Sequence, residues 1–201
     1  MYITKVEPGK GKRFRVFSED CFLFALYAKE LKQFHIAENN DVDDKSIQYI
    51  IEELVFPRAK ERSLYLLEYG TYSIVMMRKK LQSNDYPLGV IDSVIEFLID
   101  YRYLDDMEYI RRYTETYSSR KSKRQITYDL LGKGIEKDMI DNFFLDYEYC
   151  EKDAFDQLFQ RYIRGKDLGD QAVRQKVYRY FYAKGYAGSL IKDALKQYVS
   201  A

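Results

Sequence analysis

The chain has few of the residues that interrupt helices, and few of those that carry out most catalytic chemistry. Its 201 residues include only three prolines, one histidine and two cysteines, and there is no tryptophan. Low proline content excludes collagen-like and mucin-like sequences, and a hydrophobic content of 46% excludes a disordered chain. A chain of this length can bury a core without disulfide bonds, whether it folds as one body or as several modules.

The scarcity of histidine and cysteine also argues against catalysis. His35 is the only histidine, which excludes histidine metal clusters and histidine-pair acid–base mechanisms. Cys21 and Cys150 have no partner at metal-ligand spacing, so we expect two reduced thiols. The acidic segment 105–108 begins a predicted helix, where the helix dipole favours carboxylates as caps. No glycine-rich phosphate loop is present. We therefore expect no enzymatic activity, no cofactor and no metal ion.

Neither sign of charge dominates the composition. The 33 basic and 32 acidic residues give a net charge of +1, so any attraction to nucleic acid or to a membrane must be local. The longest apolar run, Phe22–Ala28, is far shorter than the roughly 20 residues that span a bilayer. The first residues lack the pattern of a signal peptide. We expect a cytoplasmic protein that does not contact a membrane.

The first 56 residues differ in pattern from the rest. Short β-branched or aromatic runs separated by turn-forming residues predict a small antiparallel unit of three strands, at residues 3–6, 14–17 and 22–24. A helix is predicted over 26–34, and Asn39-Asn40-Asp41 breaks it. A second helix is predicted to begin at the N-cap Asp43 and to end at Pro57.

From residue 58 onward the pattern is helical and repeats three times. An apolar stripe at i, i+1, i+4, i+5 and i+8 begins at Val90, Met139 and Leu190, with offsets of 49 and 51 residues. The segment before each stripe carries a matching apolar triplet. Between the last two residues of each triplet lies a short run with glycine or asparagine, which is predicted to end the helix. These triplets are Met77, Leu81 and Tyr86; Ile126, Leu130 and Ile135; and Val177, Phe181 and Tyr186.

A leading helix completes each unit, at residues 58–69, 105–119 and 153–164. We therefore predict a mainly α protein with a small N-terminal extension of strands and helices, followed by three three-helix repeats. The predicted boundaries are 1–56 for the extension, then 57–104, 105–149 and 150–201 for the repeats. Three helices alone bury little surface, so we expect each repeat to pack on its neighbour or on a partner. We expect an elongated, curved array that exists as a monomer.

Basic residues concentrate in each repeat, and acidic segments such as 136–156 lie between them. A run of charge on a helix is usually only a solvated face. Its recurrence in all three repeats favours a surface that binds an extended polyanion, or a protein filament with alternating charge. The candidate binding residues are Arg58, Lys60 and Arg62; Arg111, Arg112, Arg120, Lys121, Lys123 and Arg124; and Arg174, Lys176 and Arg179.

Several runs follow one another in the order of a known family. In the middle repeat these are Tyr103-Leu104-Asp105-Asp106-Met107-Glu108-Tyr109, Arg120-Lys121-Ser122-Lys123-Arg124-Gln125-Ile126 and Leu130-Leu131-Gly132-Lys133-Gly134-Ile135. Together they resemble the central repeat of the RecX family, the bacterial regulators of the RecA recombinase. The runs Phe56–Lys60, Leu64–Leu67 and Arg78–Leu81 resemble that family's first repeat. Departures from the family pattern at Lys121-Ser122, Asn84-Asp85 and Val75-Met76 alter turns and surface, and leave the helical frame intact.

The resemblance implies a non-enzymatic protein that binds in the helical groove of the RecA filament on DNA and bridges adjacent protomers. It implies modulation, usually inhibition, of RecA ATPase, strand exchange and coprotease activity in recombination, DNA repair and the SOS response. The basic residues would then face an acidic recombinase surface, or single- or double-stranded DNA. Two alternatives stay open: an autonomous DNA-binding protein that acts by occupying DNA, and a scaffold for another protein filament.

Overall fold

The start of the chain forms a three-stranded antiparallel sheet, which confirms the prediction from its short apolar runs. β2 (Lys5–Pro8), β3 (Arg13–Ser18) and β4 (Cys21–Tyr27) lie side by side in that order. Val16 of β3 pairs directly with Phe24 of β4, and both side chains are fully buried. This cross-strand pair of a β-branched and an aromatic residue packs one face of the sheet against the apolar core.

The connection from the sheet to the first helix differs from the prediction. Leu26 and Tyr27 were expected to start a helix, but they pair with Phe14 and Arg13 and extend β4. α1 (Ala28–Gln33) begins after them, and the backbone N–H of Tyr27 donates to the Glu30 carboxylate at 2.8 Å. Hydrogen bonding along the strand ladder outweighs helix propensity at these two positions. A separate two-stranded ladder joins β1 (Tyr2–Ile3) to β5 (Asn40–Asp41).

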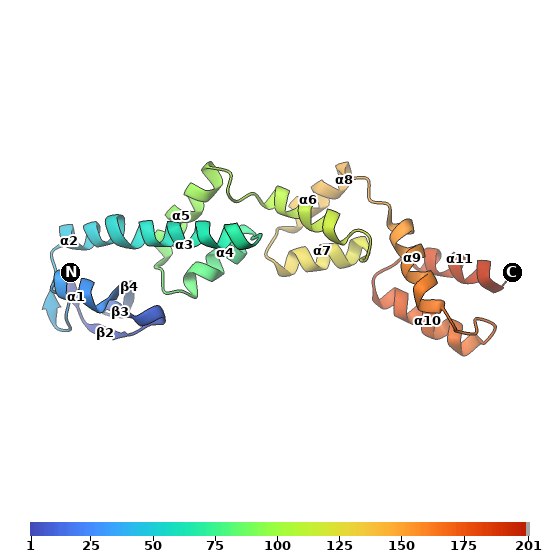
Figure 1. Ribbon diagram of the computed structural model, residues 1–201, viewed down its shortest axis with the longest axis horizontal. Helices are drawn as coiled ribbons and strands as arrows, with labels where there is room; N and C mark the ends of the chain where they lie inside the picture. Colours follow the sequence, from blue (N-terminus) through green and yellow to red (C-terminus); the bar gives the residue numbers. More distant parts are fainter. Residues whose placement is uncertain (200–201) are drawn as a thin grey trace. The chain divides into compact units, whose positions relative to one another are not determined.

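The helix predicted from Asp43 begins there but does not end at Pro57. Asp43 caps α2 (Asp44–Tyr49) by accepting the N–H of Ser46 at 2.9 Å. The chain then stays helical through a π-helical stretch, η2 (Ile50–Val55), into α3 (Phe56–Tyr69), as one continuous rod beside the sheet (Figure 1). Pro57 lies in the first turn of α3. An i→i+5 turn is wider than an α-turn, so it accommodates the proline ring and its missing N–H.

The structure, a computed structural model, describes residues 1–199 and divides after Asp105 into two compact units. In the first unit, α3 is followed by α4 (Ile74–Gln82) and α5 (Leu88–Asp100). The sheet, α2, η2 and these helices share one apolar core. Residues on both sides of the predicted boundary at 56/57 thus contribute to the same core. The division of the chain at the predicted boundaries stays a prediction.

The turn between α4 and α5 ties the sheet to the helices. The Asp85 carboxylate accepts the backbone N–H of Lys10 at 2.7 Å and lies 3.7 Å from Nε of Arg15. The guanidinium of Arg13 donates to the carbonyl of Asn84 at 2.6 Å. The carbonyl of Asn84 in the turn and the N–H of Lys10 in the β2–β3 connection are therefore each satisfied by a side chain of the other segment, which stabilises both.

The second unit consists of helices joined by short loops. They are α6 (Asp106–Tyr117), α7 (Lys123–Gly132), α8 (Lys137–Asp146), α9 (Glu151–Ile163), α10 (Gln171–Ala183) and α11 (Gly188–Val199). In sequence order, the chain from α3 onward consists of sets of three helices, close to the predicted ranges.

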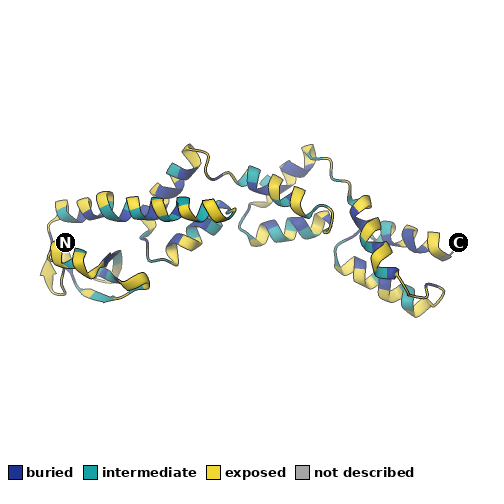
Figure 2. Ribbon diagram, viewed as in Figure 1, coloured by how far each residue is buried: buried dark blue, intermediate teal, exposed yellow. Residues whose placement is uncertain are grey.

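The predicted apolar triplets are buried in all three sets, and none of their nine side chains is more than 5% exposed. Figure 2 shows the buried residues along the inner faces of the helices. Each second helix ends within its predicted terminator, but in the first set the left-handed residue is an aspartate and not the predicted glycine or asparagine. Asp85, Gly134 and Gly185 occupy equivalent places between the second and third helix of each set, with φ of 55°, 82° and 86°. This left-handed conformation closes the second helix and turns the chain towards the third.

Buried serines begin two of the second helices, a feature that the sequence pattern did not reveal. Ser73 and Ser122 are fully buried N-caps, and their hydroxyl oxygens accept the N–H groups of Met76 and Gln125 at 3.1 Å. The Ser122 hydroxyl also donates to the carbonyl of Lys184 at 2.6 Å. One side chain thus caps α7 and joins it to the end of α10.

We predict that Gly185→Ala destabilises the protein by about 1–3 kcal/mol in urea unfolding, because the left-handed backbone disfavours any Cβ atom. An added Cβ would also lie 2.9 Å from Oγ of Ser122. Gly132→Ala is the matched control, since a Cβ there meets no atom within 4 Å. The control should be neutral or stabilising by up to about 1 kcal/mol. Equal stability of the two variants would contradict the role given to Gly185.

Candidate binding surface

The middle group of basic residues lies on the exposed surface where α6 ends and α7 begins. Arg120 lies in the loop between the helices, and Lys123 and Arg124 open α7; all three side chains are exposed. Lys123 lies over the ring of Phe144, with Nζ 4.7 Å from its centroid. Within residues 1–199, none of the three forms an ion pair. These cations are available to an anionic partner.

Lys121 belongs to the same group in sequence but is half-buried and bound by neighbouring side chains. Its ammonium group donates to Asp129 at 2.6 Å and to the hydroxyl of Tyr113 at 2.9 Å, and it lies 4.1 Å from the ring centroid of Tyr117. Burial alone would raise the pKa of Asp129, but the hydrogen bonds from Lys121 and Tyr113 outweigh it and leave this pKa lowered. Lys121 therefore joins α6 to α7, and its charge is already neutralised.

Arg111 and Arg112 project from α6 and share one carboxylate. Nε of Arg112 lies 2.8 Å from Glu108 and Nε of Arg111 lies 3.5 Å from it. More than half of each arginine side chain is exposed. Exposed ion pairs of this kind contribute about 0–1 kcal/mol, so a partner could replace Glu108 at little cost.

The basic residues of the first repeat are more tightly held. Arg58 forms an ion pair with Glu30, and its guanidinium carbon lies 5.0 Å from the ring centroid of Tyr27. Lys60 lies over Phe97, with Nζ 3.8 Å from its centroid, and Arg62 lies over Tyr65 at 5.3 Å. All three side chains are half-buried. Arg58 therefore joins α3 to α1. Lys60 contacts an aromatic ring of α5, and Arg62 contacts one on its own helix, α3.

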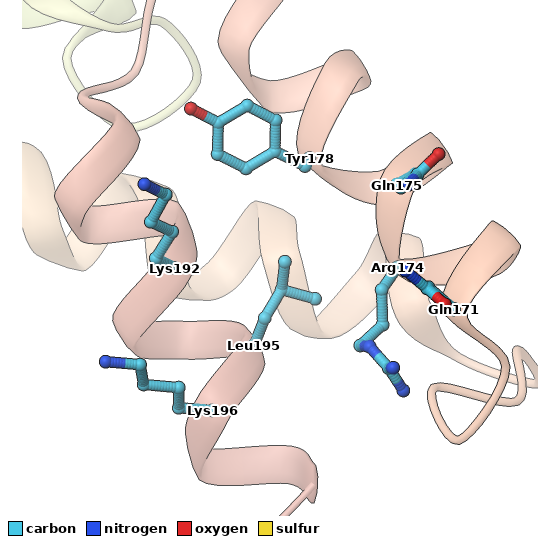
Figure 3. Close-up of a pocket in the computed structure, with 7 residues that line it drawn as sticks. All are labelled: Gln171, Arg174, Gln175, Tyr178, Lys192, Leu195 and Lys196. Carbon is cyan, nitrogen blue, oxygen red and sulfur yellow. The ribbon is translucent and has the colours of Figure 1, made fainter.

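In the third repeat, one predicted basic residue is held by the fold and two are exposed. Arg174 donates to the carbonyls of Leu168 and Gly169, each at 2.7 Å, and so holds the loop between α9 and α10. Lys176 and Arg179 are exposed on α10 and form no ion pair within the described part of the chain. The side chain of Arg174 also lines a groove between α10 and α11 of about 440 Å³. Leu195 points into this groove, between the two helices (Figure 3).

A further groove brings α7 and the end of α10 together. We call it the tyrosine groove; its volume is about 470 Å³, and it is lined by Arg124, Gln125, Tyr128, Tyr182, Ala183, Lys184 and Gly185. Tyr128 is 76% exposed and Tyr182 is 54% exposed. None of the lining residues is acidic. The groove places the predicted residue Arg124 beside Lys184, although 60 positions separate them in the sequence.

The acidic segment 105–108 lies at the start of α6, with Asp106 and Glu108 in its first turn, where the helix dipole favours carboxylates. Within residues 1–199, no three His, Cys, Asp or Glu side chains lie together as a group that could hold a metal ion. None of the helices in the described part of the chain has the length and apolar character needed to cross a membrane.

Successive three-helix sets with equivalent buried triplets define a helical-repeat protein. Comparison with known proteins shows which of them this chain is similar to. Residues 59–98 match the family model described as RecX, first three-helix domain. The chain is 29% identical to the Regulatory protein RecX of Clostridium beijerinckii, covering 97% of this chain and 94% of the relative. It is 27% identical to that of Bacillus velezensis, covering 98% of this chain and 77% of the relative.

Solved structures agree with these sequence relatives. A crystal structure of regulatory protein RecX is similar with a TM-score of 0.62 and 25% identity, covering 96% of this chain and 98% of the other. The crystal structure of RecX from Lactobacillus salivarius has a TM-score of 0.63 and covers 72% of this chain; at 21% identity it supports the fold alone. The comparisons confirm the resemblance to the RecX family that the sequence motifs indicate.

We predict that Asp129→Asn lowers the free energy of unfolding at pH 7 by about 0.5–1 kcal/mol, because it removes a partly exposed ion pair and hydrogen bond to Lys121. The folded-state pKa of Asp129 is lowered, so its contribution is present above the unfolded value of about 3.9 and is lost as the pH falls. Urea unfolding from pH 7 to pH 3 should show the difference from the parent protein shrinking below pH 4. A difference independent of pH would contradict this account.

Proposed function

We propose that the protein is a non-enzymatic regulator that binds the RecA–DNA nucleoprotein filament in its helical groove. It inhibits RecA ATPase, strand exchange and coprotease activity. The observation that supports this proposal is similarity over 97% of the chain to a protein named Regulatory protein RecX. The chemistry of the surface is compatible with it, because the exposed groups are binding groups and the candidate residues include no nucleophile with its base.

The distribution of unpaired cations supports a repeating acidic partner. Arg120, Lys123 and Arg124 on the second set, and Lys176 and Arg179 on the third, are exposed and have no ion-pair partner among residues 1–199. Charges of this kind increase the rate of association and select an oppositely charged surface. Repeated three-helix sets can each present a second helix to successive identical subunits of a filament.

Direct occupation of DNA is the competing explanation, and the same cations favour it. Affinity for bare DNA would then fall log-linearly with salt, with a slope set by the number of neutralised phosphates. Filament binding makes a different demand, because the regulator must act at concentrations at which bare DNA remains unbound.

We predict that substoichiometric amounts of the protein reduce the DNA-dependent ATPase of the cognate RecA at two salt concentrations. Binding to bare single-stranded DNA, measured under the same conditions, should be negligible at these amounts. Loss of ATPase only where bare DNA is saturated, or no loss at all, would support occupation of DNA instead.

We predict that the triple charge reversal Arg120→Glu, Lys123→Glu and Arg124→Glu raises the concentration needed for half-inhibition at least tenfold. The reason is loss of attraction at the exposed middle group, while the internal bonds of Lys121 are kept. Lys29→Glu, Lys32→Glu and Lys45→Glu form the control, since these exposed lysines lie outside the basic groups and give the same change in net charge. Circular dichroism and thermal melting should be unchanged in both. Full inhibition by the first variant would reject the residue assignment.

A further inference from the structure

One exposed leucine of the second unit lies among carboxylates. Leu145, near the end of α8, is 81% exposed, the highest fraction of any large hydrophobic side chain that the structure describes. Residues three, four and seven positions apart share a face of a helix, so two aspartates of α8 lie on the same face as Leu145. Two more acidic residues follow it, and all four are exposed. We call this surface the acidic patch; it consists of Asp138, Asp141, Leu145, Asp146 and Glu148.

A single exposed leucine is common on protein surfaces, but the charge around this one is largely uncompensated. Asp141 forms an ion pair with Lys137. Within residues 1–199, the other three carboxylates of the patch take part in no ion pair. The acidic patch therefore presents an apolar side chain together with a net negative charge.

The groove between α10 and α11 has the opposite properties. Leu195 lies near its centre, with Arg174 on the α10 side and the lysines of α11 on the other side (Figure 3). Its lining consists of Gln171, Arg174, Gln175, Tyr178, Lys192, Leu195 and Lys196, so none of it is acidic. In the described part of the chain, its three cations form no ion pair. The groove therefore presents apolar side chains between positive charges.

The spacing of the charges on the two surfaces also agrees. Lys192 and Lys196 are four residues apart on α11, and Asp138 and Asp141 are three residues apart on α8. Both separations are close to one helical turn, which places the Cβ atoms about 5–6 Å apart on one face. An α8 helix laid along α11 can therefore pair both aspartates with both lysines. The two surfaces match in charge and in spacing, and each offers an apolar side chain to the other.

We propose that the groove between α10 and α11 binds the acidic patch of a second copy of this chain. The patch does not cover the groove of its own chain, because both lie in the same compact unit and Leu145 is exposed there. The two surfaces differ, so one contact between two copies leaves one patch and one groove free. The contact is small, and the association is therefore weak; the expected monomer is the form at low concentration.

The proposal goes beyond the function proposed above because it requires neither a recombinase nor DNA. Its failure leaves filament binding untouched, and the ATPase assay can fail without affecting it. Opposite charges at the contact increase the rate of association and select this pair of surfaces over others.

The test is the oligomeric state of the full chain, measured by sedimentation velocity. We predict that the weight-average molar mass rises at least 1.5-fold between about 1 and 300 µM protein, because mass action favours a weak complex at high concentration. Raising the salt concentration to about 1 M should remove most of this rise, since the Debye length is then roughly 3 Å. A monomer at every concentration overturns the proposal, and the acidic surface of another protein becomes the alternative occupant.

Substitutions on the two surfaces test which of them meet. Leu145→Gln removes the apolar side chain of the patch, and Lys192→Glu with Lys196→Glu repels the patch from the groove. Each variant alone should remain a monomer at the highest concentration. An equimolar mixture of the two should form a one-to-one dimer, because the first variant keeps an intact groove and the second keeps an intact patch. Association of either variant alone, or no dimer in the mixture, overturns the pairing of patch with groove.

Two control variants carry matched changes in the first unit. Leu88→Gln replaces a leucine that is 66% exposed, and Lys29→Glu with Lys45→Glu reverses two exposed lysines with the same change in net charge. Both controls should associate as the parent protein does. A loss as large as in the matched variant overturns the site. If the glutamate pair on α11 lowers the melting temperature, Lys192→Gln with Lys196→Gln replaces it, and the same loss of association is required.

Discussion

The left-handed residue between the second and third helix of each set is the constraint on which the rest of the helical structure depends. At Asp85, Gly134 and Gly185 the chain must reverse abruptly, so that one apolar triplet is buried by both helices. Glycine adopts this conformation without strain, whereas aspartate does so at a cost. In the first set, the hydrogen bond that Asp85 accepts from the N–H of Lys10 and its ion pair with Arg15 offset that cost. The same turn therefore closes the helix and attaches the sheet.

Position in the sequence does not distinguish a cation that stabilises the fold from one that faces solvent. Lys121 lies between exposed basic residues, yet it is half-buried and donates hydrogen bonds to Asp129 and Tyr113. Arg174 similarly holds a loop through two backbone carbonyls. Such cations contribute stability, because a partner would have to replace their present bonds. The basic residues that stay exposed and unpaired are therefore fewer than the basic residues counted in each helix.

Periodicity and turn chemistry predicted most of the fold, because they depend on neighbours in sequence. The strands, the cap at Asp43, the buried triplets and the left-handed turns all follow from local patterns. The continuous helix through Pro57 did not, since a π-turn depends on how the surrounding core packs. The pocket lined by Arg161, Arg164, Lys166 and Lys184 depends on contact between the end of α9 and α10, where Tyr162 stacks on Tyr180, and no spacing along the chain encodes this contact. Three of these cations lie in one short basic run, residues 161–166, but the run does not show that Lys184 lies beside them.

The uninterrupted rod from α2 to α3 has a consequence for how the first unit comes apart. Its beginning packs in the part of the core that contains the sheet, and its end belongs to the first three-helix set. Opening either part would leave half of the same rod without its apolar covering. The sheet and the first helical set are therefore expected to exchange their amide protons as a single cooperative block. The N-terminal segment, which the sequence pattern sets apart from the first repeat, therefore contributes to the stability of that repeat.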